Sequence, residues 1–187
     1  MKKIYLLVFT LIITQNTMAQ KDDYYYNIPD APKEYTAATV ASRMVDGLGF
    51  RYYWATFGLN EKDLAFKPNA EARSTEETID HILGLSQVIV NSTLKVANGA
   101  KQPKMTFKEK RNKTLANFKK ASEILRKAKD ISEFKIIFGK TEFPFWNQIN
   151  GPISDALWHV GQVVSFRRSS GNPFPKGVSV LRGTKRD

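Results

Sequence analysis

The chain of 187 residues contains two histidines, and one of them lies at helical spacing from a carboxylate. His159 follows Asp155 by four residues, so a helix places both side chains on one face, within reach of a common ion. An imidazole and a carboxylate can bind a divalent metal, which can activate water or polarise a carbonyl group. A hydrogen bond between the two side chains would also satisfy them, and the spacing leaves both interpretations open.

The helix expected around this pair has two contrasting faces. Gln162 and Phe166 share the face of Asp155 and His159, and Trp158 flanks it. The opposite face carries an aliphatic stripe at the same period, made of Ile153, Leu157, Val160 and Val164. A solvent-facing stripe normally carries Lys and Glu instead. We therefore expect this helix to be buried on both sides, with one side packed and the other lining a polar pocket.

The other histidine, His81, lies on a second expected helix, at the edge of its apolar stripe. A single histidine there is more often a core or boundary residue than a metal ligand. Glu77, one turn earlier, has capping-box spacing to Ser74, so its carboxylate is a candidate for helix capping as well as for proton transfer. Gln162 is a candidate for proton transfer or for orienting a metal ligand.

The composition limits the chemistry. The chain has no cysteine, which excludes thiolate catalysis and cysteine-ligated zinc, so any metal must be bound by nitrogen and oxygen atoms. The net charge of +11 indicates either affinity for anionic surfaces or solvated basic helix faces, and we favour the second interpretation. The length suits one compact domain with a single hydrophobic core.

Residues 1–19 have the pattern of a cleaved signal peptide. Lys2 and Lys3 precede an apolar stretch over 4–13, which is too short to span a bilayer, and Ala19 stands where a signal peptidase would cut. We therefore expect an exported protein, periplasmic or secreted. Export makes nucleic acid an improbable partner, and no other apolar stretch predicts a membrane span.

The remaining pattern predicts an all-α fold, a four-helix bundle over residues 35–173. An extended N-terminal arm is expected at 20–34 and a C-terminal tail at 174–187. Capping residues and apolar spacings of three and four predict helices over 36–58, 74–98, 106–129 and 144–170. Pro152 predicts a kink in the last helix. Residues 134–138 resemble a strand without a partner and are interpreted as a packed connector.

Two segments of the chain resemble a known family. STEETIDHILGLSQVIVN, and later NGPISDALWHVGQVVSFRRSSGNP, are similar to the DinB/YfiT-like superfamily of metalloenzymes. Its members are four-helix bundles in which a histidine on the second helix and two ligands four residues apart on the fourth bind a divalent ion. The resemblance implies that His81, Asp155 and His159 are metal ligands, with Gly161 and Gln162 following as in the family. Asp155 stands where the family usually has a histidine.

The resemblance implies a divalent-metal-dependent enzyme, a hydrolase or a transferase, that acts on a small-molecule substrate. Zinc is the first choice for the ion, and nickel, manganese or iron are the alternatives. Characterised relatives include transferases that use small cytoplasmic thiols, which an exported protein would seldom meet, so we favour a hydrolase. The alternative is a non-catalytic, exported ligand-binding or envelope-associated bundle. A homodimer is left open as the assembly.

Overall fold

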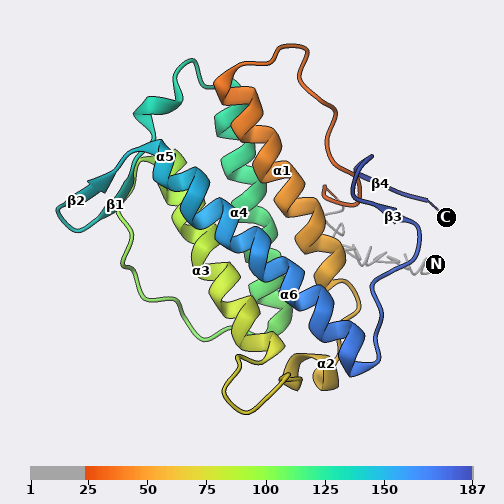
Figure 1. The fold of residues 1–187 in the computed structure, drawn as a ribbon. Helices are drawn as coiled ribbons and strands as arrows, with labels where there is room; N and C mark the ends of the chain where they lie inside the picture. The colour runs from red at the N-terminus through yellow and green to blue at the C-terminus, as the bar shows by residue number, and fades with distance from the viewer. Residues whose placement is uncertain (1–23, 187) are drawn as a thin grey trace, which may run out of the picture.

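In the computed structural model, residues 24–186 are described, and they form a bundle of helices with two small hairpins (Figure 1). The bundle consists of α1 (Ala37–Thr56), α3 (Thr75–Leu94), α4 (Phe107–Lys127) and α6 (Ser154–Ser170). The prediction of an all-α four-helix bundle is confirmed. The predicted signal peptide at 1–19 lies outside the described residues. No helix within residues 24–186 combines the length and the apolar character needed to cross a membrane.

Shorter elements connect the four helices. The helical ones are α2 (Glu61–Ala65), a 3-10 turn (Ile131–Glu133), α5 (Phe145–Gln148) and a π-helical turn (Ile149–Ile153). The strands form two antiparallel hairpins, β1 (Ile136–Phe138) with β2 (Thr141–Phe143) and β3 (Val178–Ser179) with β4 (Thr184–Lys185). The short helix α2 was not predicted and lies in what the sequence pattern indicates as a loop.

Three of the long helices begin at capping boxes. The hydroxyls of Thr36, Ser74 and Thr106 each accept a hydrogen bond from the backbone N–H three residues further on. The helix α3 ends at Leu94, four residues before the predicted end at Asn98. Lys95 adopts the left-handed conformation, with φ of 59°, and the chain leaves the helix there.

The sequence pattern indicated that residues 134–138 are a connector without a partner strand, and this prediction is wrong. Ile136 pairs with Phe143 across the β1–β2 hairpin, and the turn contains Gly139 with φ of +57°. The partner strand follows immediately in the chain, and it is too short and too polar to show a strand pattern of its own. The Asn98 backbone N–H donates to the Ile137 carbonyl, which ties the connection between α3 and α4 to this hairpin.

The core lies between the four long helices, and α1 supplies the largest part of it. Its fully buried side chains include Val45, Phe50 and Tyr52, which pack with Ile79 and Ile82 of α3 and with Phe118 of α4. On α6 the buried hydrophobic residues are Ala156, Val160 and Val163, whereas Leu157 is 43% exposed. The buried stripe of α6 is therefore rotated around the helix relative to the predicted one. Residues three apart and residues four apart both lie on one face of a helix with 3.6 residues per turn, so the sequence pattern allowed either choice.

The predicted kink at Pro152 is confirmed. Gly151 has a non-helical backbone, with φ of −93° and ψ of −109°, inside the wide turn that separates α5 from α6. Proline has no backbone N–H to donate and its ring crowds the preceding turn, so the regular helix starts again after it. As a result, Asp155 lies in the first turn of α6.

The arm and the tail pack together against the bundle. Tyr25 is buried against α1, and the backbone N–H of Ile28 donates to the carbonyl of Gly183. Figure 1 shows the beginning of the described chain beside the β3–β4 hairpin. Both ends of the described chain are thus held against the same side of α1.

Candidate metal centre

Two helices bring the three predicted ligand residues together. His81 extends from α3, whereas Asp155 and His159 extend from α6, and one donor atom of each lies within 4.8 Å of the others. Nε2 of His81 lies 3.1 Å from Oδ2 of Asp155, and Nε2 of His159 lies 3.2 Å from Oδ1 of the same carboxylate. The two imidazole rings are 4.5 Å apart and nearly perpendicular. The group could hold a metal ion.

Packing beneath the group fixes its geometry. Ile82 and Ala156, the sequence neighbours of His81 and Asp155, are fully buried in the core between α3 and α6. Close packing of these two residues allows little sliding of one helix against the other. The ligand side chains are therefore carried by rigid elements at a defined distance.

Gln162 determines which nitrogen of His159 can bind a metal. Nδ1 of His159 lies 2.7 Å from Oε1 of Gln162. A carbonyl oxygen only accepts hydrogen bonds, so Nδ1 carries the proton and Nε2 of the neutral ring has a free lone pair. That lone pair faces the carboxylate of Asp155. Two acceptors, Nε2 of His159 and the carboxylate of Asp155, thus face each other. A cation bound between them would be attracted to both, so the residues present fit a metal ion.

The centre lies at the edge of the bundle and not inside it. The exposed side-chain fractions are 34% for His81, 39% for Asp155 and 13% for His159. Trp158, which flanks them, is 71% exposed. The expectation that α6 is buried on both sides is therefore wrong, because Leu157 and Trp158 are exposed on the part of this helix that α1 and α3 leave uncovered. This exposure leaves an open side at which water or a substrate could bind, as in catalytic metal sites.

Glu77, the other candidate for proton transfer, is engaged as a helix cap. Its carboxylate accepts a hydrogen bond of 2.6 Å from the backbone N–H of Ser74 and lies 3.3 Å from the ammonium of Lys67. The hydrogen bond from Ser74 and the nearby charge of Lys67 hold the pKa of Glu77 below its ordinary value. A carboxylate with a lowered pKa is a weaker base, so these contacts favour the capping interpretation.

Two contacts that hold α6 in place were not predicted from the sequence. Phe66, directly after α2, packs against Phe166 on the ligand-bearing face of α6, with ring centroids 5.9 Å apart. Arg167, in the last turn of α6, is buried and donates to the carbonyls of Trp54 and Ala55. No local pattern predicts either contact, because both depend on how separate helices meet.

Comparison of the chain with protein-family models, with curated proteins and with solved structures finds no match. The fold and the site define the protein at a coarser level. It is a helical bundle that carries a His/Asp/His group capable of holding a metal ion.

Proposed function

We propose that this protein is a divalent-metal-dependent enzyme of the DinB/YfiT-like kind, with hydrolase-like activity on a small molecule. The observation that carries the proposal is the meeting of His81, Asp155 and His159 with donor atoms within 4.8 Å of one another. The order of the ligands, one histidine on α3 and two residues four apart on α6, agrees with the family that the two segments resemble. Two histidines and one carboxylate with open positions suit catalytic metal sites.

The chain's own residues have separate tasks in this proposal. Gln162 holds the ring of His159 so that Nε2 points into the centre. Asp155 contributes a negative charge, which strengthens cation binding and makes the bound ion a weaker Lewis acid than three imidazoles would. When bound, the ion would supply a nucleophilic water or polarise a substrate carbonyl.

Zinc is the metal that we propose, because a set of two imidazole nitrogens and one carboxylate oxygen is a common zinc environment. The same donors also suit iron, manganese and nickel. We further propose that the protein is exported, on the basis of residues 1–19, and that nucleic acid is not its partner. A homodimer stays a prediction, and sedimentation of the purified protein tests it.

The alternative is a non-catalytic bundle that binds a ligand outside the cytoplasm. One observation favours it, namely that the carboxylate of Glu77 is held by Ser74 and Lys67 and is a poor base. Under this alternative the metal, if bound, holds the ligand without activating a water molecule. The two proposals therefore differ in turnover and not in metal binding.

The deciding experiment is calorimetric titration of the chelator-treated protein with zinc, followed by an assay with 4-nitrophenyl acetate. The proposal predicts one zinc per chain, strong loss of affinity in His159→Ala and Asp155→Asn, and unchanged affinity in Trp158→Ala as the matched control. It also predicts hydrolysis that needs zinc and is lost in His159→Ala. Stoichiometric zinc without zinc-dependent hydrolysis would favour the binding protein. Absence of binding would refute both the metal site and the enzyme.

A further inference from the structure

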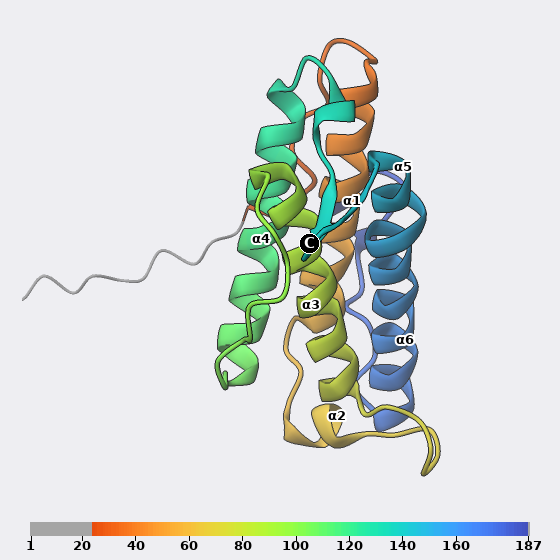
Figure 2. The same ribbon diagram turned by 90° about the vertical axis from the view of Figure 1, so that its left-hand side faces the viewer.

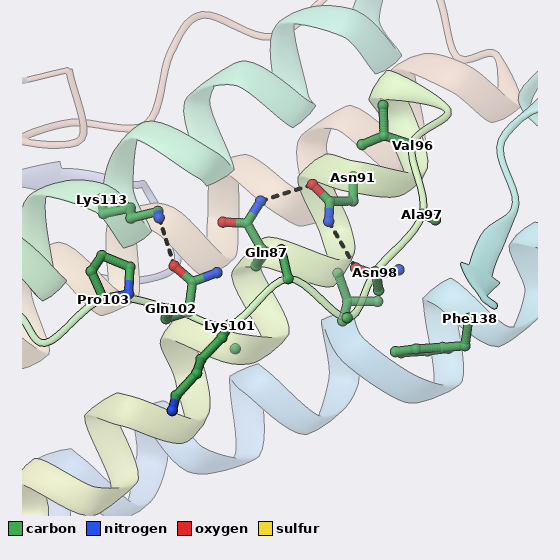
Figure 3. Close-up of a pocket in the computed structure, with 14 residues that line it drawn as sticks. Gln87, Asn91, Val96, Ala97, Asn98, Lys101, Gln102, Pro103, Lys113 and Phe138 are labelled. Atoms are coloured by element: carbon green, nitrogen blue, oxygen red, sulfur yellow. Dashed lines mark hydrogen bonds between the residues drawn. The ribbon is translucent and has the colours of Figure 1, made fainter.

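A pocket lies beside α3, outside the metal centre (Figure 3). Its volume is about 510 Å³, within the range of small-molecule sites. Its walls come from the C-terminal half of α3, from the connection between α3 and α4, and from Phe138 of β1. Figure 2 shows this connection running down beside α3, with α6 on the other side of that helix. The pocket begins at Gly84, one helical turn after His81.

A row of side-chain amides crosses the pocket. Gln87 Nε2 donates to Asn91 Oδ1 at 2.8 Å, and Asn91 Nδ2 donates to Asn98 Oδ1 at 2.9 Å. Figure 3 shows the three amides in line. Each amide nitrogen has two N–H donors, and these bonds use only one donor of Gln87 and one of Asn91. The row is therefore fixed in orientation and keeps donors for a ligand.

An exposed aromatic ring completes one wall. Asn98 donates twice to the Ile137 carbonyl, from its backbone N–H at 2.8 Å and from Nδ2 at 3.1 Å. This double contact holds the connection against β1 and so places Phe138 at the pocket, where its side chain is 47% exposed. A ring that borders hydrogen-bond donors suits a ligand with both an apolar face and polar edges.

The charge in the pocket is positive. Lys101 and Lys113 line it, and among the residues of the described chain that line it there is no carboxylate. The ammonium of Lys113 donates to Oε1 of Gln102 at 2.6 Å, whereas Lys101 lies on the exposed connection. The amides thus outnumber the lysines, and one of the two charges is already engaged. This balance suits a ligand with several hydroxyl groups and one negative charge better than a compact, highly charged phosphate.

We propose that this pocket binds an acidic sugar. The apolar face of the sugar ring packs on Phe138, the hydroxyl groups bind the free donors of Gln87 and Asn91, and the carboxylate pairs with Lys101. The proposal rests on the pocket alone and holds whether or not a metal binds at His81, Asp155 and His159. Gln87 and Asn91 follow His81 by six and ten residues, so a sugar held there would be separate from that centre.

The test is calorimetric titration of the chelator-treated protein with galacturonic acid, which carries one carboxylate, beside neutral galactose and inorganic phosphate. We expect saturable binding of the acidic sugar, at least tenfold tighter than that of either comparison ligand. Phe138→Ala and Lys101→Gln should each weaken it about tenfold, which corresponds to about 1.4 kcal/mol. Phe143→Ala, on the partner strand, and Lys104→Gln, outside this pocket, are the matched controls and should leave it unchanged.

Three results would overturn the proposal. One is the absence of saturable binding of the acidic sugar to protein whose circular dichroism shows an intact fold. Another is phosphate binding as tight as sugar binding, which would indicate a simple anion site. The third is unchanged affinity in both Phe138→Ala and Lys101→Gln, which would place the ligand elsewhere.

Discussion

Gln162 accepts a hydrogen bond of 2.7 Å from Nδ1 of His159, its neighbour one turn earlier on α6. The contact fixes both the rotation of the imidazole and the position of its proton. With Nδ1 engaged by Gln162, Nε2 of His159 is directed toward the carboxylate of Asp155, 3.2 Å away. The Gln162–His159 pair therefore orients the proposed ligand atom, and zinc binding by variants at Gln162 distinguishes a metal centre from an ion pair between His159 and Asp155.

Replacing Gln162 tests its positioning role. Gln162→Leu should lower zinc affinity about tenfold, because the ring of His159 loses the acceptor that orients it. Gln162→Glu keeps an acceptor at the same place and should retain the affinity. Competition with a chromophoric chelator measures both variants. Equal zinc affinity in Gln162→Leu and in the native protein would contradict the role assigned here.

The buried guanidinium of Arg167 should be essential for stability. It donates to the carbonyls of Trp54 and Ala55 at the end of α1, and to the backbone and side-chain oxygens of Asn172. Arg167→Lys cannot reproduce this fork of donors and should lower the free energy of unfolding by about 3 kcal/mol. Arg168→Lys, at the exposed neighbouring position, is the matched control and should change it by less than about 0.5 kcal/mol. Urea unfolding measures both, and equal midpoints would contradict the prediction.

Two glycines on long helices should respond oppositely to alanine. A Cβ at Gly49 would lie 2.6 Å from Cε2 of the buried Tyr25, so Gly49→Ala should displace the N-terminal arm and destabilise the fold by about 1–3 kcal/mol. A Cβ at Gly84 would meet nothing within 4 Å, so Gly84→Ala should stabilise its helix by about 0.5–1 kcal/mol. Thermal unfolding of the two variants checks the prediction. A stabilised Gly49→Ala would show that Tyr25 does not dock as described.

The carboxylate of Asp63 should make the free energy of unfolding depend on pH in the acidic range. Burial tends to raise the pKa of Asp63, but hydrogen bonds from Asn172, Ser170 and the Asn60 backbone outweigh burial and lower it. The ionised form is therefore favoured by folding. Its contribution is complete above the pKa of the unfolded chain, about 3.9, and is lost as pH falls through the lower pKa of the folded state.

Asp63→Asn should consequently be less stable than the native protein at pH 7, with a difference that shrinks as the pH falls toward 3. Urea unfolding at several pH values measures the difference. Ser170→Ala removes one of the three donors and should show the same trend at smaller size. A difference that is constant between pH 7 and pH 3 would contradict the lowered pKa.

Local signals in the sequence predicted the parts of the fold that depend on local chemistry. Ser74 and Thr106 mark helix starts because a hydroxyl satisfies free backbone donors, and Gly171 ends α6 because it adopts φ of 99°. Pro152 breaks the last helix because it lacks an N–H. These features depend on one or two neighbouring residues, and the sequence displays them directly.

Features that depend on contacts between distant segments could not be predicted in the same way. The left-handed conformation of Lys95 comes without the glycine that usually signals it. The exposure of Trp158 depends on which faces of α6 are covered, and the periodicity allowed two choices for its buried stripe. For the metal centre, helix order and the family resemblance predicted that His81 joins Asp155 and His159, whereas its position at the surface was missed.

The central claim is that His81, Asp155 and His159 bind one cation together. Crystals of the zinc-treated protein, measured with anomalous scattering at the zinc edge, test it most directly. The predicted result is one anomalous peak about 2.0–2.2 Å from an Nε2 atom of each histidine and from a carboxylate oxygen of Asp155. A zinc peak elsewhere, or no zinc at this position in crystals that contain bound zinc, would contradict the claim.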